Sequence, residues 1–168
     1  MYQYGTTDDQ FAEISVVTRF HAMRNPEAVN GMMDLEFVGV NEITVQDVTE
    51  SRLIAWPLHL LECCMVSDGG GAVVIASPEV ARNCRVKPVW IIGGAEATKY
   101  RENKGDITVT AGAQSGPRAF EDAGDRRQEI DVLMASAAFY ITARWSNVDL
   151  GFWSKRKGGE FVSAGHLA

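Results

Sequence analysis

The chain has 168 residues, of which 46% are hydrophobic and 23% charged, and its formal net charge is −6. A chain of this length can bury a core without disulfides or metals, so we expect one domain or part of one. The balance of 16 basic to 22 acidic residues is mildly acidic and is not concentrated in any tail, so the electrostatic footprint of a nucleic-acid-binding protein is absent from the sequence. No apolar run approaches the ~18 residues that span a bilayer, and the first residues lack the pattern of a secretion signal. A cytoplasmic protein without a membrane partner is expected.

The first predicted element is an N-terminal helix. Thr7 and Gln10 form a capping box before apolar residues spaced by three and four, which predicts a helix that reaches about Met23. The following residues, 24–43, contain one proline and two glycines and are predicted to be loop.

A second, short helix is predicted where Thr44 and Asp47 repeat the capping pattern, and it extends through Ser51. The front part of the chain is therefore expected to consist of helix and loop.

Beyond residue 68 the apolar residues form short continuous runs. The predicted strands are residues 69–76, 87–98 and 129–135. The predicted helices are residues 77–84, 117–124 and 137–151, while 99–116 carry no clear pattern. This β-α-β-α-β-α order indicates an α/β fold, and continuous apolar strands indicate a sheet that is covered on both faces.

The predicted sheet is unusual because it stops after three strands and a glycine-rich, loop-like segment follows. Such a sheet has exposed edges, which natural proteins usually cover. The pattern therefore predicts a fragment of a larger fold, which by itself aggregates or binds a hydrophobic dye.

The sequence SDGGGA at residues 67–72 resembles a phosphate-binding loop only superficially. It lacks a following Lys-Ser or Lys-Thr pair, and it precedes a predicted strand instead of opening a helix. Glycines that let the backbone pass close to another element are the favoured interpretation.

The three cysteines are Cys63, Cys64 and Cys84, an odd number without metal-binding spacing, which argues against disulfides and zinc. His59 lies four residues before Cys63, so on a helix its imidazole could activate the thiol. A buried structural cysteine is the commoner outcome and is favoured here, with the catalytic pair left open.

Several other residues could carry chemistry but have simpler interpretations. Glu62 and Asp68 could be general acids, although carboxylates near turns more often cap or form them. His166, near the end of the chain, is most simply a solvated residue. Core packing is favoured over a stacking platform for the tryptophans, which are Trp56, Trp90, Trp145 and Trp153.

A series of motifs, in order along nearly the whole chain, resembles the thiolase superfamily. The branch it is most like is the lipid-transfer-protein thiolases and acetyl-CoA acetyltransferases. The motifs are YQYGTTDDQFAEISVVTRFHAMRNPEA, ITVQDVTESRLIAWPLHLLECCMVSDGGGAVVIAS, KPVWIIGGAEAT, AFEDAG, EIDVLMASAAFYITARWSNVDLGFW and KGGEFVSAGHLA.

The resemblance implies a layered αβαβα fold of two related halves that forms homodimers, in some members with a small partner subunit. It assigns residues 1–66 to the helix and loop region at the end of the N-terminal half. Residues 67–168 become the start of the C-terminal domain, an incomplete βαβαβα unit. On this basis the chain is an internal fragment.

The resemblance also implies chemistry on acyl-CoA thioesters, by thiolysis or Claisen condensation of 3-ketoacyl-CoA. Coenzyme A thioester is then the substrate, and no bound cofactor or metal is expected. In the family's pattern the nucleophilic cysteine and the catalytic Gly-His segments fall outside residues 1–168. Cys63 and Cys64 match a structural turn and His166 a loop before those segments. No catalytic residue is therefore assigned, the coenzyme-binding residues stay open, and the fragment is expected to be inactive alone.

Two alternatives stay open within the same resemblance. Relatives commonly carry a Tyr-Asp-Ser-Phe-like stretch where Ala135–Phe139 read ASAAF, which makes a retro-aldolase less favoured because it loses a tyrosine and an acid. The same change favours a non-catalytic lipid-transfer or partner subunit.

Overall fold

The computed structural model describes residues 1, 5–33, 39–99, 106–152 and 154. Its helices are α1 (Asp8–Ala22), α2 (Pro26–Met33), α3 (Val45–Glu50), α4 (Pro78–Arg82), α5 (Gly112–Ala123) and α6 (Tyr140–Asp149). The strands are β1 (Leu53–Ala55) and β2 (Leu58–His59), and the short 3-10 helices are η1 (Leu60–Glu62) and η2 (Arg127–Glu129).

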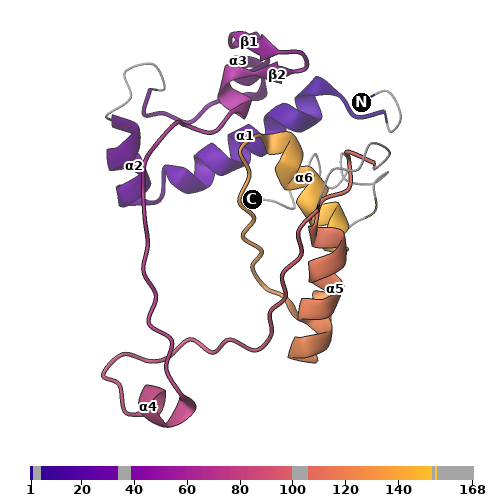
Figure 1. Cartoon of the computed structure of the whole chain (residues 1–168). Helices are drawn as coiled ribbons and strands as arrows, with labels where there is room; N and C mark the ends of the chain where they lie inside the picture. Colours follow the sequence, from indigo (N-terminus) through magenta and orange to yellow (C-terminus); the bar gives the residue numbers. More distant parts are fainter. Residues whose placement is uncertain (2–4, 34–38, 100–105, 153, 155–168) are drawn as a thin grey trace.

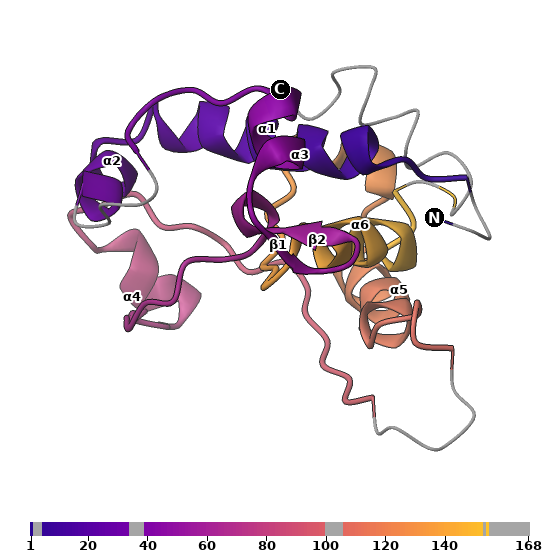
Figure 2. The ribbon, with the colours of Figure 1, turned by 90° about the horizontal axis from the view of Figure 1, so that it is seen from above.

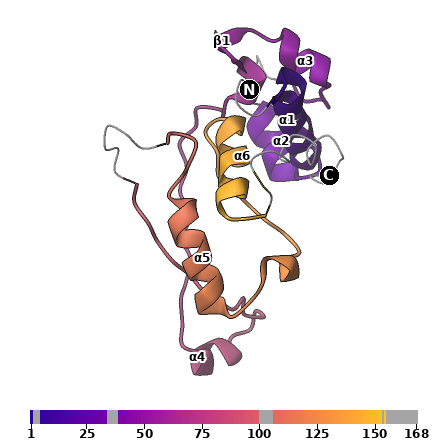
Figure 3. The same cartoon turned by 90° about the vertical axis from the view of Figure 1, so that its right-hand side faces the viewer.

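Two regions differ in how they are built. The first, which we call the packed region, consists of α1 and the elements that α1 contacts, among them α3, η1 and α6. The second, the extended region, comprises residues 65–99 and 130–138 and has α4 as its one helix among the described residues. Figures 1 and 3 show α4 at the far end of this region, well away from α1 and α3.

Helix α1 confirms the first prediction. The Thr7 hydroxyl accepts a bond from the Gln10 backbone N–H at 3.3 Å, and the Gln10 side chain accepts one from the Thr7 N–H at 3.3 Å. These bonds satisfy N–H groups that a helix leaves open at its start. The helix buries one face against its neighbours, with Phe11, Ala12, Ile14, Ser15 and Arg19.

Helix α3 confirms the second prediction, with Thr44 as its N-cap and the Asp47 carboxylate 2.7 Å from the Thr44 backbone N–H. Val48 on this helix is completely buried. Figure 2 shows α3 and the hairpin lying on the same side of α1. In that hairpin β1 pairs antiparallel with β2, and Leu53 lies opposite His59.

Two local structures differ from the sequence predictions. Helix α2 forms where loop was expected, because Asn25 accepts a bond from the Glu27 N–H at 3.1 Å and Pro26 suits the first helical turn. The helix that would bring the His59 imidazole to Cys63 does not form: the Trp56–Pro57 peptide is cis and β2 follows it. The imidazole of His59 therefore does not lie one helical turn from Cys63.

Helices α5 and α6 were predicted correctly in kind, although α5 begins at Gly112 and contains Pro117. Gly124 ends it with φ +71°, a conformation that favours glycine. At Gly116 an added Cβ would lie 2.8 Å from Leu150 Cδ2, so the absence of a side chain allows the end of α6 to pack on α5.

The predicted strands at 69–76, 87–98 and 129–135 do not form among the described residues, where the sheet is the β1–β2 hairpin. Their side chains are exposed, with Val74 96% and Val89 93% accessible. A strand exists only with a neighbour that accepts and donates its backbone hydrogen bonds, and no described segment takes that position. The layered αβαβα arrangement and the division at residues 66 and 67 stay predictions.

Aromatic placement also differs from expectation. Trp56 is 76% and Trp90 51% exposed, so core packing is wrong for both. Trp153 and His166 lie outside the described residues. Within the described part of the chain, no helix combines the length and apolar character that a bilayer crossing requires.

Candidate functional site

A large groove opens where α1, η1 and the start of α6 meet. It encloses about 860 Å³. Its walls are mainly apolar and come from α1, the hairpin and residues 60–67 and 135–143. The apolar residues lining it include Ile14, Met32, Ile43, Leu60, Leu61, Ala135, Ala137, Phe139 and Ala143. A concave, mostly apolar site of this size is typical of small-molecule binding.

Few polar groups line the groove. The Ser15 side chain is 1% exposed, and its hydroxyl oxygen has no partner among the described residues. Burial raises the pKa of Tyr140, and a hydrogen bond with Thr18 opposes this. Arg19 is held by the backbone, since its Nη1 donates to the Gly39 carbonyl at 3.2 Å and the Asn41 carbonyl at 3.0 Å. Ser15 is thus the polar group that a ligand could satisfy.

Cys63 and Cys64 line this groove, and their geometry does not support a nucleophile paired with His59. The Cys63 thiol donates to the His59 backbone carbonyl at 3.4 Å. The His59 Nδ1 lies 2.7 Å from the Ser51 carbonyl, which only accepts, so Nδ1 carries the proton. Burial raises the pKa of the Cys63 thiol, and nearby Glu62 and Cys64 raise it further. This favours the protonated thiol, the opposite of what a nucleophile needs.

The prediction of a buried turn holds only in part for the cysteines. Cys63 is half-buried and forms an isolated antiparallel bridge with Phe139. Cys64, whose N–H donates to the Ala138 carbonyl at 2.9 Å, is exposed, as is Cys84.

Glu62 is a cap, as the simpler interpretation predicted. Its carboxylate accepts a bond from the His59 backbone N–H at 2.7 Å and is 3% exposed. Burial raises the pKa of Glu62, while the His59 backbone bond lowers it. Asp68 is exposed. Within the described ranges, His, Cys, Asp and Glu side chains form no group of three or more that could hold a metal ion.

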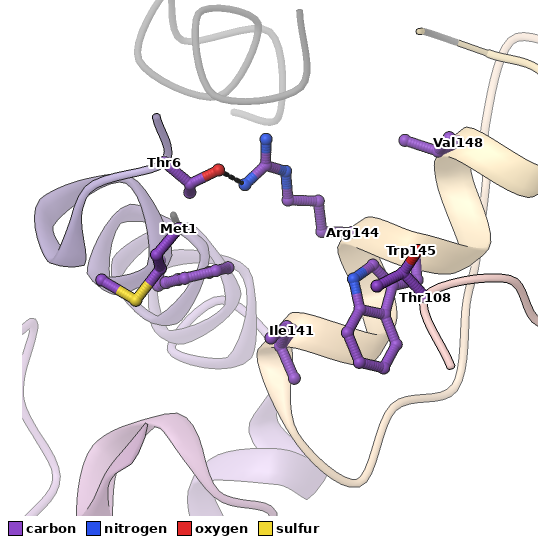
Figure 4. A pocket seen from close by; sticks show the side chains of 8 residues that line it. Met1, Thr6, Thr108, Ile141, Arg144, Trp145 and Val148 are labelled. Atoms are coloured by element: carbon purple, nitrogen blue, oxygen red, sulfur yellow. Dashed lines mark hydrogen bonds between the residues drawn. The ribbon is translucent and has the colours of Figure 1, made fainter. Parts of the chain in front are cut away.

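A second, smaller cavity of about 100 Å³ lies between the N-terminal end of α1 and α6 (Figure 4). Arg144 enters it from α6 and is 8% exposed, and its Nη1 donates to the Thr6 hydroxyl. Burial lowers the pKa of this guanidinium.

Sequence reasoning missed this cavity, although a signal was present. Ile141, Arg144, Trp145 and Val148 follow the three-and-four spacing of a single helix face, and all four line the cavity. An arginine on such an apolar face predicts either a buried charge or a partner for it.

Comparison with known proteins identifies the class first. Residues 93–168 match the family described as "Thiolase C-terminal domain-like". Over these residues the chain is similar to the thiolase superfamily, which its motifs resemble.

Particular relatives extend the similarity over nearly the whole chain. An acetyl-CoA acetyltransferase of Methanothermobacter thermautotrophicus is 33% identical over 98% of the chain. A steroid side-chain-cleaving aldolase of Thermomonospora curvata is 30% identical over 99% of it. The chain spans 42% of the length of each of these relatives. A solved structure described as "Ltp2-ChsH2(DUF35) aldolase" superposes with a TM-score of 0.87 and 30% identity, over 99% of this chain and 44% of that one.

Proposed function

We propose that this chain is part of a thiolase-like acyltransferase that acts on acyl-CoA thioesters by thiolysis or Claisen condensation, and that its contribution is to bind the acyl group. The observation that carries the proposal is the similarity to an acetyl-CoA acetyltransferase along 98% of the chain. The groove beside α1 supplies the physical support.

The walls of the groove suit an acyl chain. Each buried methylene group contributes about 0.8 kcal/mol, so an apolar groove of this size favours a long acyl group over coenzyme A alone. The unpartnered hydroxyl of Ser15 can donate to the thioester carbonyl, which would relieve the cost of a buried polar atom without a hydrogen bond. Since burial and nearby Glu62 favour the protonated form of the Cys63 thiol, the nucleophile is not assigned to Cys63.

Binding calorimetry with octanoyl-CoA and free coenzyme A tests the proposal. The chain should bind octanoyl-CoA at least tenfold more tightly than coenzyme A, because a tenfold ratio needs only about 1.4 kcal/mol. Ala137→Trp places a large side chain in the groove and should abolish the difference. Ala138→Trp is the matched control, since Ala138 does not line the groove.

Two results would overturn this assignment. One is equal affinity for octanoyl-CoA and coenzyme A. The other is thiolysis by the chain that is lost in Cys63→Ser or Cys64→Ser, because the proposal assigns no nucleophile to these thiols.

A retro-aldolase activity is the second candidate. It is favoured by the names of the superposed structure and of the Thermomonospora curvata relative, which are both aldolases. The ASAAF stretch at Ala135–Phe139 lacks the tyrosine and the acid of the family's Tyr-Asp-Ser-Phe-like pattern, which ranks it lower. Release of an aldehyde or ketone from a β-hydroxyacyl thioester would favour it over acyl transfer.

A non-catalytic role, in which the chain serves a partner subunit or a second copy, is the remaining candidate. The exposed apolar segments of the extended region favour it, because unpaired strands readily pair with another chain. Sedimentation velocity distinguishes the roles: stable self-association without octanoyl-CoA binding would favour this candidate.

A further inference from the structure

The cavity between α1 and α6 contains a charge without a counter-ion among the residues that the structure describes. Arg144 is 8% exposed, and its hydrogen bond in the described structure goes to the neutral hydroxyl of Thr6. The ion pairs among the described residues lie elsewhere, at Arg24–Glu42 and Arg126–Glu129. Burying an unpaired charge is costly, so buried guanidinium groups are normally paired with an anion.

The surroundings of Arg144 compensate its charge only in part. The guanidinium carbon lies 5.7 Å from the centre of the Phe11 ring, at the outer limit of a cation–π contact. Burial lowers the pKa of Arg144. Four of its five N–H donors remain available to a ligand, since one bonds to Thr6.

The shape and chemistry of the cavity define what it can hold. Figure 4 shows Thr6 and Arg144 facing each other, with Ile141 and Trp145 lower on the same side as Arg144. The Thr6 oxygen accepts from Arg144, which leaves its O–H free to donate. The remaining lining is largely apolar, and the volume of about 100 Å³ suits a ligand of a few heavy atoms.

We propose that this cavity binds a small organic carboxylate with a short apolar tail, which Arg144 and Thr6 hold by its carboxylate group. A carboxylate matches the planar guanidinium in a bidentate geometry. A phosphate has a stronger hydration shell and more acceptors than these two residues can satisfy, and it has no apolar part to contact Trp145 and Val148. The site is separate from the acyl groove, since the described residues that line the two cavities are different.

Calorimetry with propionate and its neutral isostere propionamide tests this proposal on the full chain. Propionate should bind at least tenfold more tightly than propionamide. Arg144→Met keeps a long side chain but removes the charge, and it should weaken propionate binding at least tenfold. Thr6→Val should weaken it several-fold. Arg126→Met, a change at an exposed arginine, is the matched control and should leave binding unchanged.

Thermal melting of the unmodified chain gives a second readout that does not depend on how the variants fold. Propionate should raise the melting midpoint more than propionamide at equal concentration, because a ligand that binds only the folded state stabilises it. Equal shifts, or equal propionate affinity of the unmodified chain and Arg144→Met, would overturn the site. Phosphate binding as tight as that of propionate would overturn the carboxylate assignment. If the unmodified chain does not bind octanoyl-CoA, this result would count against the proposed function but not against the carboxylate site.

Discussion

The packed and extended regions contain similar apolar residues, but these are buried in the packed region and exposed in the extended region. Phe11 and Val48 in the packed region are 3% and 0% exposed, whereas Val74 in the extended region is 96% exposed. A helix satisfies most of its backbone hydrogen bonds internally and needs a neighbour only for one face. A strand needs a neighbour for its backbone as well, so apolar character alone does not bury it.

The largest expected difference between the regions comes from removing a core side chain. Phe11→Ala should lower the free energy of unfolding by about 3–5 kcal/mol, because it deletes a buried aromatic ring. Val74→Ala should change it by less than about 0.5 kcal/mol, because this side chain contacts little in the structure. Chemical denaturation of both variants measures the two values. Similar losses of unfolding free energy in the two variants would mean that Val74 is buried in solution. The packed and extended regions would then not differ in how they bury apolar side chains.

Helix caps give an intermediate effect. The Thr44 hydroxyl accepts a bond from the Asp47 N–H at 3.1 Å, so Thr44→Ala should cost about 1 kcal/mol of unfolding free energy. Ser77 precedes α4 but makes no such cap bond, and Ser77→Ala should cost less than about 0.5 kcal/mol. Urea denaturation checks both. A larger loss for Ser77→Ala than for Thr44→Ala would contradict the assignment of caps.

The smallest expected effect is on how stability depends on pH, which should change in opposite directions for Glu62 in the packed region and Glu79 in the extended region. Burial raises the pKa of Glu62, so its folded form holds the proton more tightly than the unfolded chain. The contribution of Glu62 to stability is fully present below its pKa in the unfolded chain, about 4.5. It is lost as the pH rises through the raised pKa of the folded chain. Glu62→Gln should therefore flatten this fall and stabilise the chain near neutral pH.

Glu79 in the extended region should behave in the opposite way. Bonds from its own backbone and then the Ser77 side chain lower its pKa, so its contribution is present above the unfolded value and is lost as the pH falls through the folded one. Melting midpoints of Glu62→Gln and Glu79→Gln between pH 4 and 7 test this contrast. The same direction of change in both variants would refute it.

Local signals in the sequence predicted the packed region well. The capping boxes at Thr7 and Thr44 and the terminal glycine at 124 lie within a few residues of what they control, and all three features are present. The sequence also contains a signal for the start of α2, since Asn25 precedes a proline, although loop was predicted there. The hairpin was missed because Pro57 suits both a helix start and a turn.

The candidate site was much less predictable. Sequence spacing suggested that His59 could face Cys63, but the pairing depended on a helix that does not form. The groove is assembled from α1, the hairpin and residues 135–143, which no local pattern brings together. Arg144 could have been noticed on the apolar face of α6, whereas its position beside Thr6 depends on how two distant segments pack.

The sequence by itself determined most of the α-helices, the capping boxes at Thr7 and Thr44 and the resemblance to thiolases, because these depend on neighbouring residues or on motifs in order. Tertiary structure alone decided which apolar runs are buried, that the Cys63 thiol bonds to a backbone carbonyl, and that Arg144 lies buried beside Thr6. Burial and hydrogen-bond partners are properties of segments brought together in space, and a strand or a buried charge is defined by what lies next to it.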